Sequence, residues 1–251
     1  MSERLPLFQY WDSGEPPPDV AELIDGLRRD NPDLDHRLFD ETTAAAFIAE
    51  HCGQRELSAF RACAVPAMQA DYFRLCALRV CGGLYIDADC YGRQPLSGLL
   101  ENVSEALMVS LGGYLTTGVM VFRRPDNPFI RANLELATDN IESQVFDSVY
   151  IATGPPVSDA VRAIADPAWF SEAFERADEW NRGMRFGRLL ERARSLISPT
   201  PELKSAFGDV RIIPHEQLVQ WVGTKRAAYK GTDVDWRRWK GSIYRNPVST
   251  P

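Results

Sequence analysis

Residues 70–92 read ADYFRLCALRVCGGLYIDADCYG, and the interpretation of the whole chain depends on this stretch. It begins inside a helical pattern that starts at Pro66, a residue that the first turn of a helix tolerates. Gly82 and Gly83 form a typical helix stop and lead directly into an apolar run. The stretch therefore predicts a long helix from Pro66, a tight connection and a short strand.

The strand predicted at residues 84–88 ends in two carboxylates. Tyr85, Asp87 and Asp89 alternate with apolar residues, so one face of the strand would present both carboxylates. Ligands of open α/β sheets bind outside the carboxyl ends of the strands. Two carboxylates with no protein cation beside them suit Mg²⁺ or Mn²⁺, which shares its remaining positions with water and substrate phosphates. The alternative is an ordinary turn, because Asp is frequent in turns.

The rest of the chain predicts an α/β fold, with a Rossmann-like, mostly parallel sheet flanked by helices. A strand at residues 5–11, a helix after the prolines at 16–18 and a strand at 36–40 form a β-α-β opening, which favours parallel strands. Two short helices are expected between residues 41 and 64. Further elements are strands at 106–111, 118–123 and 210–214, a loop at 112–117, and helices starting near 127 and 158.

A single domain is expected over residues 1–251, because this length suits one α/β domain with an insertion. Residues from about 165–200 are amphipathic and charged, and we interpret them as a helical insertion. The tail at 215–251 is rich in Trp, Tyr and Gly without a regular period. Such a segment more often folds over a site than forms a sheet, so we expect it to close the site.

The composition, 45% hydrophobic and 25% charged, is that of an ordinary globular protein. With a net charge of -7 and no long Lys/Arg block, the chain is not expected to bind nucleic acid. No apolar run is long enough for a transmembrane segment and no signal peptide is evident, so we expect a cytoplasmic location. Five cysteines without a C-x-x-C pair favour reduced, buried thiols over zinc ligands or disulfides.

Asp71 and Arg74 lie three residues apart on the predicted helix and therefore share one of its faces. They could form a surface ion pair of little energetic value. They could also point toward the strand end and hydrogen-bond sugar hydroxyls. Their spacing does not distinguish the two readings.

Residues 71–89, DYFRLCALRVCGGLYIDAD, closely resemble the signature of the DXD-motif sugar transferases, glycosyltransferase family thirty-two. This family includes fungal α-1,6-mannosyltransferases and bacterial polysaccharide enzymes, and its core is similar to that of the large clostridial glucosylating toxins. The resemblance covers nearly the whole chain. The further segments that carry it are FQYWDSGEPPPDV at residues 8–20, RRDNPDLDHRLFD at 28–40, GVMVFRRPDNPF at 118–129, TGP at 153–155 and the Trp-rich tail.

The resemblance implies a GT-A fold and a metal-dependent, retaining glycosyltransferase. Its donor would be a nucleotide-sugar, a UDP- or GDP-sugar, and its acceptor a glycan or glycoconjugate, as in polysaccharide biosynthesis. The implied cofactor is Mn²⁺ or Mg²⁺. Front-face attack is the expected route to retention, because no nucleophile for a covalent intermediate is evident.

The same resemblance assigns roles to individual residues. Asp71 and Arg74 would hold the donor sugar, and Asp87 and Asp89 would contact the ribose and the metal-diphosphate, with Asp89 the firmer metal ligand. The remaining donor-site residues are Tyr85 as a support, Trp11 stacked on the base, Gln9 in the opening strand, and Trp236 and Ser242 in the tail.

The chain departs from the family pattern at three places. Phe8 stands where the family often has His, and Thr117 stands where an Asn often precedes the glycine of the later strand. The family tail tends to offer a His, whereas this chain offers Asp235, whose carboxylate could replace it as a metal ligand.

These departures leave a catalytically idle nucleotide-sugar-binding protein open as an alternative function. The toxin likeness raises another alternative, an effector that glycosylates a protein target. Acceptor specificity would reside in the loop at 112–117 and in the helices at 169–197, since such pockets are built from variable segments.

Overall fold

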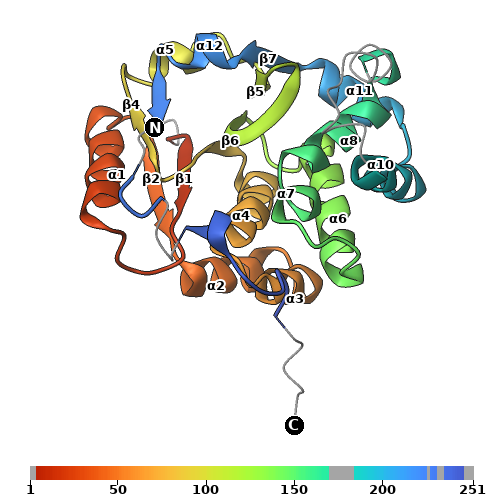
Figure 1. The fold of residues 1–251 in the computed structure, drawn as a ribbon. Helices are drawn as coiled ribbons and strands as arrows, with labels where there is room; N and C mark the ends of the chain where they lie inside the picture. The colour runs from red at the N-terminus through yellow and green to blue at the C-terminus, as the bar shows by residue number, and fades with distance from the viewer. Residues whose placement is uncertain (1–3, 170–183, 225–226, 231–234, 246–251) are drawn as a thin grey trace.

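A six-stranded sheet with the order β2-β1-β3-β6-β5-β7 runs through the centre of the molecule (Figure 1). The computed structural model describes residues 4–169, 184–224, 227–230 and 235–245. β1 is parallel to β2 and β3, and β5 is parallel to β7, whereas β6 runs antiparallel to β3 and β5. The strands are β1 Pro6–Tyr10, β2 Asp35–Phe39, β3 Gly83–Ile86, β5 Ala106–Leu111, β6 Tyr114–Phe122 and β7 Val210–Pro214; β4 Cys90–Gly92 and β8 Val222–Thr224 form a separate antiparallel pair.

Both faces of the sheet are buried, since its central strands are largely apolar runs whose successive side chains enter two different apolar clusters. Leu84 and Val121 belong to one apolar cluster, whereas the neighbouring Tyr85 and Phe122 belong to the other. Helices α1, α5 and α12 contribute to the first cluster, and the remaining α-helices that the structure describes contribute to the second. Figure 1 shows α1 and the group of α6, α8 and α10 on opposite sides of the molecule. The predicted α/β fold, with a mostly parallel sheet flanked by helices, is confirmed.

The helices have the following bounds: α1 Pro18–Asp30, α2 Glu41–His51, α3 Gln54–Ala62, α4 Pro66–Cys81, α5 Ser97–Leu100, α6 Pro128–Ser143, α7 Val149–Ala152, α8 Pro155–Ala165, α10 Met184–Leu196, α11 Pro201–Gly208 and α12 His215–Leu218, with a 3₁₀ turn, η1, at Trp236–Arg238. The helix predicted from Pro66 has the expected bounds. The two short helices predicted between residues 41 and 64 are α2 and α3. At the start of α6, Asn127 accepts a hydrogen bond from the backbone N–H of Phe129, as its N-cap position predicts.

The connection from α4 to β3 requires two glycines. Gly82 and Gly83 have φ angles of 64° and 103°, which disfavour residues with a Cβ. A Cβ at Gly82 would lie 2.8 Å from the carbonyl oxygen of Phe122, and one at Gly83 would lie 2.6 Å from that of Pro6. The helix can therefore turn directly into the central strand while the neighbouring strands approach closely.

Several predicted boundaries were wrong. β3 ends at Ile86, so Asp87 and Asp89 lie in the turn beyond it and do not alternate along a strand. The loop expected at 112–117 is only a two-residue turn, because β6 already begins at Tyr114. The helix expected from about residue 158 begins at Pro155, after the short helix α7. The pairing of β8 with β4 was not predicted.

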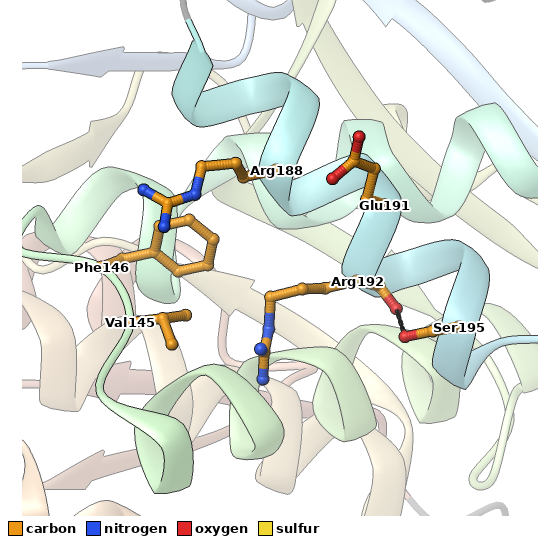
Figure 2. Close-up of a pocket in the computed structure, with 6 residues that line it drawn as sticks. All are labelled: Val145, Phe146, Arg188, Glu191, Arg192 and Ser195. Carbon is orange, nitrogen blue, oxygen red and sulfur yellow. Dashed lines mark hydrogen bonds between the residues drawn. The ribbon is translucent and has the colours of Figure 1, made fainter.

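The region interpreted as an insertion, about 165–200, is mostly helical where it is described. It contains the end of α8 and all of α10, whereas residues 170–183 lie outside the described residues. A pocket of about 310 Å³ lies between α10 and the connection from α6 to α7 (Figure 2). No residue predicted for the donor site lines it. The lining residues are Val145, Phe146, Arg188, Glu191, Arg192 and Ser195.

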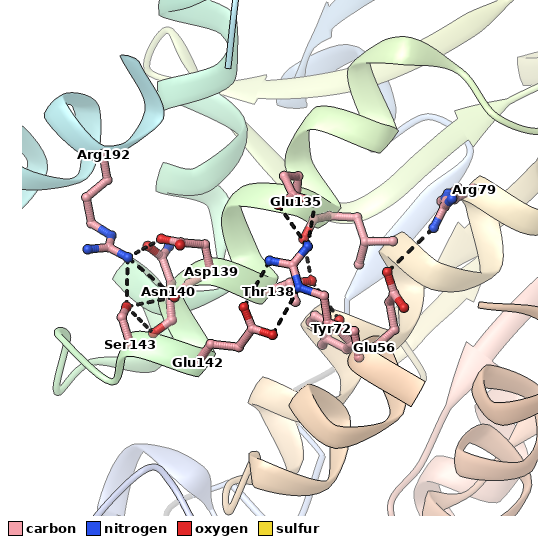
Figure 3. Close-up of polar contacts among 12 residues, drawn as sticks. Glu56, Tyr72, Arg79, Glu135, Thr138, Asp139, Asn140, Glu142, Ser143 and Arg192 are labelled. Atoms are coloured by element: carbon pink, nitrogen blue, oxygen red, sulfur yellow. Dashed lines mark hydrogen bonds and ion pairs between the residues drawn. The ribbon is translucent and has the colours of Figure 1, made fainter. Parts of the chain in front are cut away.

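Ion pairs on the helical side tie α6 to its neighbours (Figure 3). Arg192 of α10 contacts the carboxylate of Asp139. From α3, Arg55 contacts Glu135 at 2.8 Å and Glu142 at 2.9 Å, two carboxylates of α6 that lie two helical turns apart. These contacts link α3, α6 and α10 on the face of the sheet that carries the second apolar cluster.

Within the described residues, no helix is both long and apolar enough to cross a membrane. The five cysteines are free thiols. Cys63, Cys76 and Cys90 are buried, whereas Cys52 and Cys81 are partly exposed. The prediction of buried thiols is therefore confirmed for three cysteines and wrong for two.

Candidate functional site

The candidate site lies where the parallel strands β1 and β3 end. Asp87 is the first residue after β3, and its backbone N–H donates to the carbonyl oxygen of Gly118 at 2.9 Å. A Cβ at Gly118 would lie 2.7 Å from Oδ2 of Asp87. The glycine of β6 therefore provides the space that the Asp87 carboxylate occupies, at the sheet edge where ligands of α/β folds bind.

Arg74 joins the helix to the strand end. Its Nη2 lies 2.8 Å from Oδ1 of Asp71 and 3.1 Å from Oδ1 of Asp87, and its guanidinium carbon lies 4.6 Å from the centre of the Tyr85 ring. The side chain of Arg74 is only 5% exposed. The surface ion pair considered for Asp71 and Arg74 is therefore excluded, since this pair is buried and points at the strand end. The structure brings together four of the predicted residues.

The carboxylate of Asp71 is further held by the short turn after α7. The hydroxyl of Thr153 donates to Oδ2 of Asp71 at 3.5 Å. The pKa of Asp71 is raised to about 6, mainly by burial and also by the nearby Asp87 carboxylate, against the opposing effects of Arg74 and Thr153. The pKa of Asp87 is also raised, mainly by burial, while Arg74 opposes the shift. The site thus holds two carboxylates around one buried guanidinium.

Asp89 lies on the same turn and contacts a cation from the tail. Oδ2 of Asp89 forms an ion pair with Nζ of Lys230, and both side chains are mostly buried. Our expectation that no protein cation stands beside the two carboxylates was wrong, because Arg74 contacts Asp87 and Lys230 contacts Asp89. Sequence reasoning missed Lys230, which follows Asp89 by 141 positions in a tail without a regular pattern.

A chain of hydrogen bonds fixes the turn from behind. Nε2 of Gln9 donates to the carbonyl oxygen of Asp87 at 3.4 Å, and Oε1 of Gln9 lies 2.6 Å from Nε2 of His36. Nδ1 of His36 accepts from Nε of Arg28 at 3.2 Å, so the ring is neutral with its proton on Nε2. Burial lowers the pKa of His36 to about 4, and Arg28 adds to the effect. Gln9 therefore positions the backbone of the carboxylate turn.

Aromatic contacts hold the tail against both sides of the site. The ring of Trp11, just after β1, meets that of Tyr229 edge-on at 5.2 Å between centres. The ring of Tyr150 in α7 meets that of Trp236 at 5.1 Å. These contacts bring the tail to the ends of β1 and α7.

Asp235 and Ser242, the other two predicted tail residues, are engaged in local structure. Asp235 is buried, and its carboxylate accepts from the backbone N–H of Arg237 at 3.1 Å as the N-cap of η1. The hydroxyl of Ser242 accepts from the backbone N–H of Tyr244 at 3.0 Å. Among the residues that the structure describes, no group of three His, Cys, Asp or Glu side chains is arranged to hold a metal ion. Asp235 therefore does not complete a three-ligand cluster with Asp87 and Asp89.

The donor set at the strand end nevertheless fits a divalent cation. Asp87 and Asp89 offer carboxylate oxygens from one short turn, and Mg²⁺ is commonly held by one or two carboxylates together with substrate phosphates. Each carboxylate contacts a protein cation through one of its oxygens. Asp87 and Asp89 are accordingly the residues that would hold Mn²⁺ or Mg²⁺.

A comparison with family models agrees with this location. Residues 17–106 match the family described as "Glycosyltransferase sugar-binding region containing DXD motif". A search of curated proteins finds no match. Among solved structures, the chain is similar to "PaToxG Glycosyltransferase", with 13% identity and a TM-score of 0.48 over 80% of this chain and 87% of that chain. The part of the chain that contains Asp71, Arg74 and both turn carboxylates therefore resembles a glycosyltransferase sugar-binding region of the DXD type.

Proposed function

We propose that the chain is a glycosyltransferase that moves a sugar from a UDP- or GDP-sugar to a glycan or glycoconjugate, with Mn²⁺ or Mg²⁺ as cofactor and with retention at the anomeric carbon. The observation that supports this proposal most directly is the buried bridge that Arg74 makes between Asp71 and Asp87. It lies within the residues that match the DXD sugar-binding region. It joins a carboxylate of α4 and a carboxylate at the end of β3 into one fixed polar surface.

The residues of this surface have complementary capacities. The carboxylate of Asp71 accepts hydrogen bonds, and the guanidinium of Arg74 donates them, so together they can hold the hydroxyls of a sugar. Both are fixed by packing, which lowers the entropic cost of orienting the donor for attack. Because Asp71 and Asp87 are each paired with Arg74, they suit a holding role better than that of a covalent nucleophile. This arrangement supports front-face attack.

Asp87 and Asp89 would hold the divalent cation at the turn after β3. When bound, such a cation stabilises negative charge on a departing diphosphate. The turn is anchored from behind by Gln9 and from the side by the carbonyl oxygen of Gly118. Its geometry is therefore set by the fold before any ligand binds, as efficient electrostatic stabilisation requires.

The test is a screen of UDP- and GDP-sugars with the purified chain, with and without Mn²⁺, read as release of the nucleoside diphosphate. We expect release from at least one donor and its loss in Asp89→Ala, with unchanged folding by circular dichroism. Asp25→Ala is the matched control, because that side chain is 69% exposed in α1. A fully active Asp89→Ala variant would end the proposal. Donor binding without release or transfer would favour the idle nucleotide-sugar-binding alternative.

Retention and the acceptor class need separate measurements. We expect the anomeric configuration of the donor to be kept in the product, which NMR of the first-formed glycoside reports. Mass spectrometry of glycan and protein acceptors separates glycoconjugate assembly from modification of a protein target.

A further inference from the structure

We propose that Lys230 competes with the divalent cation for Asp89 and, once the cation is bound, turns to the diphosphate of the donor. This inference rests on the proposed function and adds a residue that neither the motif nor the family match includes, since the match ends at residue 106. It starts from the ion pair between Nζ of Lys230 and Oδ2 of Asp89.

The backbone around Lys230 is held in place by three contacts. Ala227 is buried against Val20, Ile24 and Ala88, and Ala88 lies between the two turn carboxylates. The backbone N–H of Ala228 donates to Oδ2 of Asp19 at 2.6 Å.

The third contact comes from Tyr229, whose ring packs edge-on against Trp11. A turn closed by the hydrogen bond from the backbone N–H of Lys230 to the carbonyl oxygen of Ala227 then directs the lysine to Asp89. The side chain of Lys230 is only 20% exposed. Its position is therefore set by anchored neighbours and is not that of a free surface lysine.

The two cations of the site differ in their freedom to change partners. Arg74 is 5% exposed, contacts two carboxylates and packs on the Tyr85 ring, so it cannot leave without uncovering buried charge. Among the residues that the structure describes, Lys230 makes one ion pair, through an ammonium on a flexible stem. An ammonium is a compact charge with three donors that can exchange one oxygen ligand for another.

The charges at the turn favour such an exchange. Asp89 offers the oxygen that a hard cation prefers, and the ammonium of Lys230 already neutralises it. A cation bound at Asp89 repels an ammonium at the same oxygen, whereas a diphosphate held nearby attracts it. Lys230 would therefore neutralise Asp89 in the ligand-free protein and, in the donor complex, place a positive charge beside the diphosphate.

The experiment measures binding of Mn²⁺ alone, by the electron paramagnetic resonance of free Mn²⁺, to the wild type and to Lys230→Met. Removing the ammonium frees Asp89, so we expect Lys230→Met to bind Mn²⁺ about tenfold more tightly, as loss of one charged hydrogen bond predicts. Lys230→Arg keeps the charge and should bind Mn²⁺ as the wild type does. Lys240→Met is the matched control, because Lys240 is an exposed residue of the same tail.

The second measurement is binding of UDP and GDP at saturating Mn²⁺, by calorimetry. In this measurement the substitution should weaken binding, because the diphosphate loses the ammonium. We expect Lys230→Met to bind the nucleoside diphosphate about tenfold more weakly, with Lys240→Met unchanged. Opposite signs in the two measurements distinguish this role from a general loosening of the tail, which would not tighten Mn²⁺ binding.

Two results would overturn the inference. One is Mn²⁺ binding to Lys230→Met that is no tighter than to the wild type, and the other is unchanged nucleoside diphosphate binding. Asp89→Asn keeps this failure separate from that of the proposed function. If Asp89→Asn abolishes Mn²⁺-dependent nucleotide binding while Lys230→Met changes nothing, only the role of Lys230 is wrong. If the wild type itself shows no Mn²⁺-dependent nucleotide binding, the proposed function fails as well.

Discussion

Gly118 lies so close to Asp87 that a Cβ on the glycine would meet Oδ2 of the carboxylate at 2.7 Å. The backbone of Gly118 has no positive φ angle, so the absence of a side chain matters here because of space and not because of conformation. Gly118, which follows Thr117 in β6, thus helps to set the orientation of the Asp87 carboxylate, the first of the D-x-D motif.

We predict that Gly118→Ala will reduce donor turnover by at least about tenfold, because the carboxylate of Asp87 must shift from the position in which it contacts Arg74. The measurement is nucleoside diphosphate release at saturating donor, with thermal unfolding as a check on the fold. Gly187→Ala is the control, since a Cβ there meets nothing within 4 Å and the change in an exposed helix adds up to about 1 kcal/mol of stability. Full activity of Gly118→Ala would contradict the assigned role of Asp87.

Arg74→Lys is predicted to keep the charge and lose the function. One guanidinium nitrogen contacts Asp71 and Asp87 while the planar group packs on Tyr85, and a lysine ammonium cannot reproduce this geometry. We expect turnover to fall about a hundredfold, mainly through kcat, because the donor is no longer positioned for attack. Arg74→Met should in addition destabilise the fold by about 3–5 kcal/mol in urea unfolding, because it leaves two carboxylates without their buried partner.

Arg55→Met provides the contrasting case on the helical surface. Arg55 contacts Glu135 and Glu142, yet these side chains are 41–45% exposed, so water screens the ion pairs. We expect a loss of no more than about 1 kcal/mol in urea unfolding and no change in donor turnover. A loss as large as that for Arg74→Met would show that burial does not explain the difference between the two arginines.

The buried Asp159 of α8 gives a prediction about pH. Burial raises its pKa from 3.8 to about 7, although the backbone N–H of Leu115 and the charge of Arg162 oppose the rise. The folded state therefore binds more protons than the unfolded state between these pH values, and the stability that this group contributes is lost as pH rises from about 4 to 7. Asp159→Asn keeps an acceptor for Leu115 and does not titrate.

We predict that Asp159→Asn will be more stable than the wild type at pH 8 by about 2 kcal/mol, and that the difference will shrink toward pH 4. The measurement is urea unfolding of both proteins at pH 4.5, 6 and 8. Comparing the variant with the wild type at each pH cancels the opposite contribution of His36, whose lowered pKa costs stability as pH falls through about 6.5 to 4. A difference that does not depend on pH would contradict the raised pKa.

Helix ends were predicted well where capping or helix-breaking residues mark them in the sequence. Pro66 and the glycine pair at 82–83 mark the two ends of α4, and Asn127 marks the start of α6, because capping depends on neighbouring residues. The end of β3 was less well predicted. In the sequence, Asp89 continues the alternation of apolar and polar residues, although its backbone already lies in the turn after the strand.

Contacts between distant residues could not be predicted in this way. Lys230 and Asp89 are 141 positions apart in the sequence, and no spacing rule connects residues at such a separation. β8 is only three residues long and pairs with β4, so neither strand had a period that could be recognised. Likewise, a spacing of three on a helix could not distinguish a surface pair from the buried pair of Asp71 and Arg74.

The anchoring of Lys230 also has a consequence for the order in which the molecule is made. α4 and the carboxylate turn are synthesised long before the segment around residues 227–230, and domains fold as units during synthesis. Until that segment leaves the ribosome, Asp89 lacks its ammonium partner and Trp11 lacks the ring of Tyr229. Because β7 and β8 also follow the turn in the chain and the domain folds as a unit, we expect the carboxylate turn and its ammonium partner to take up their positions in the same folding step.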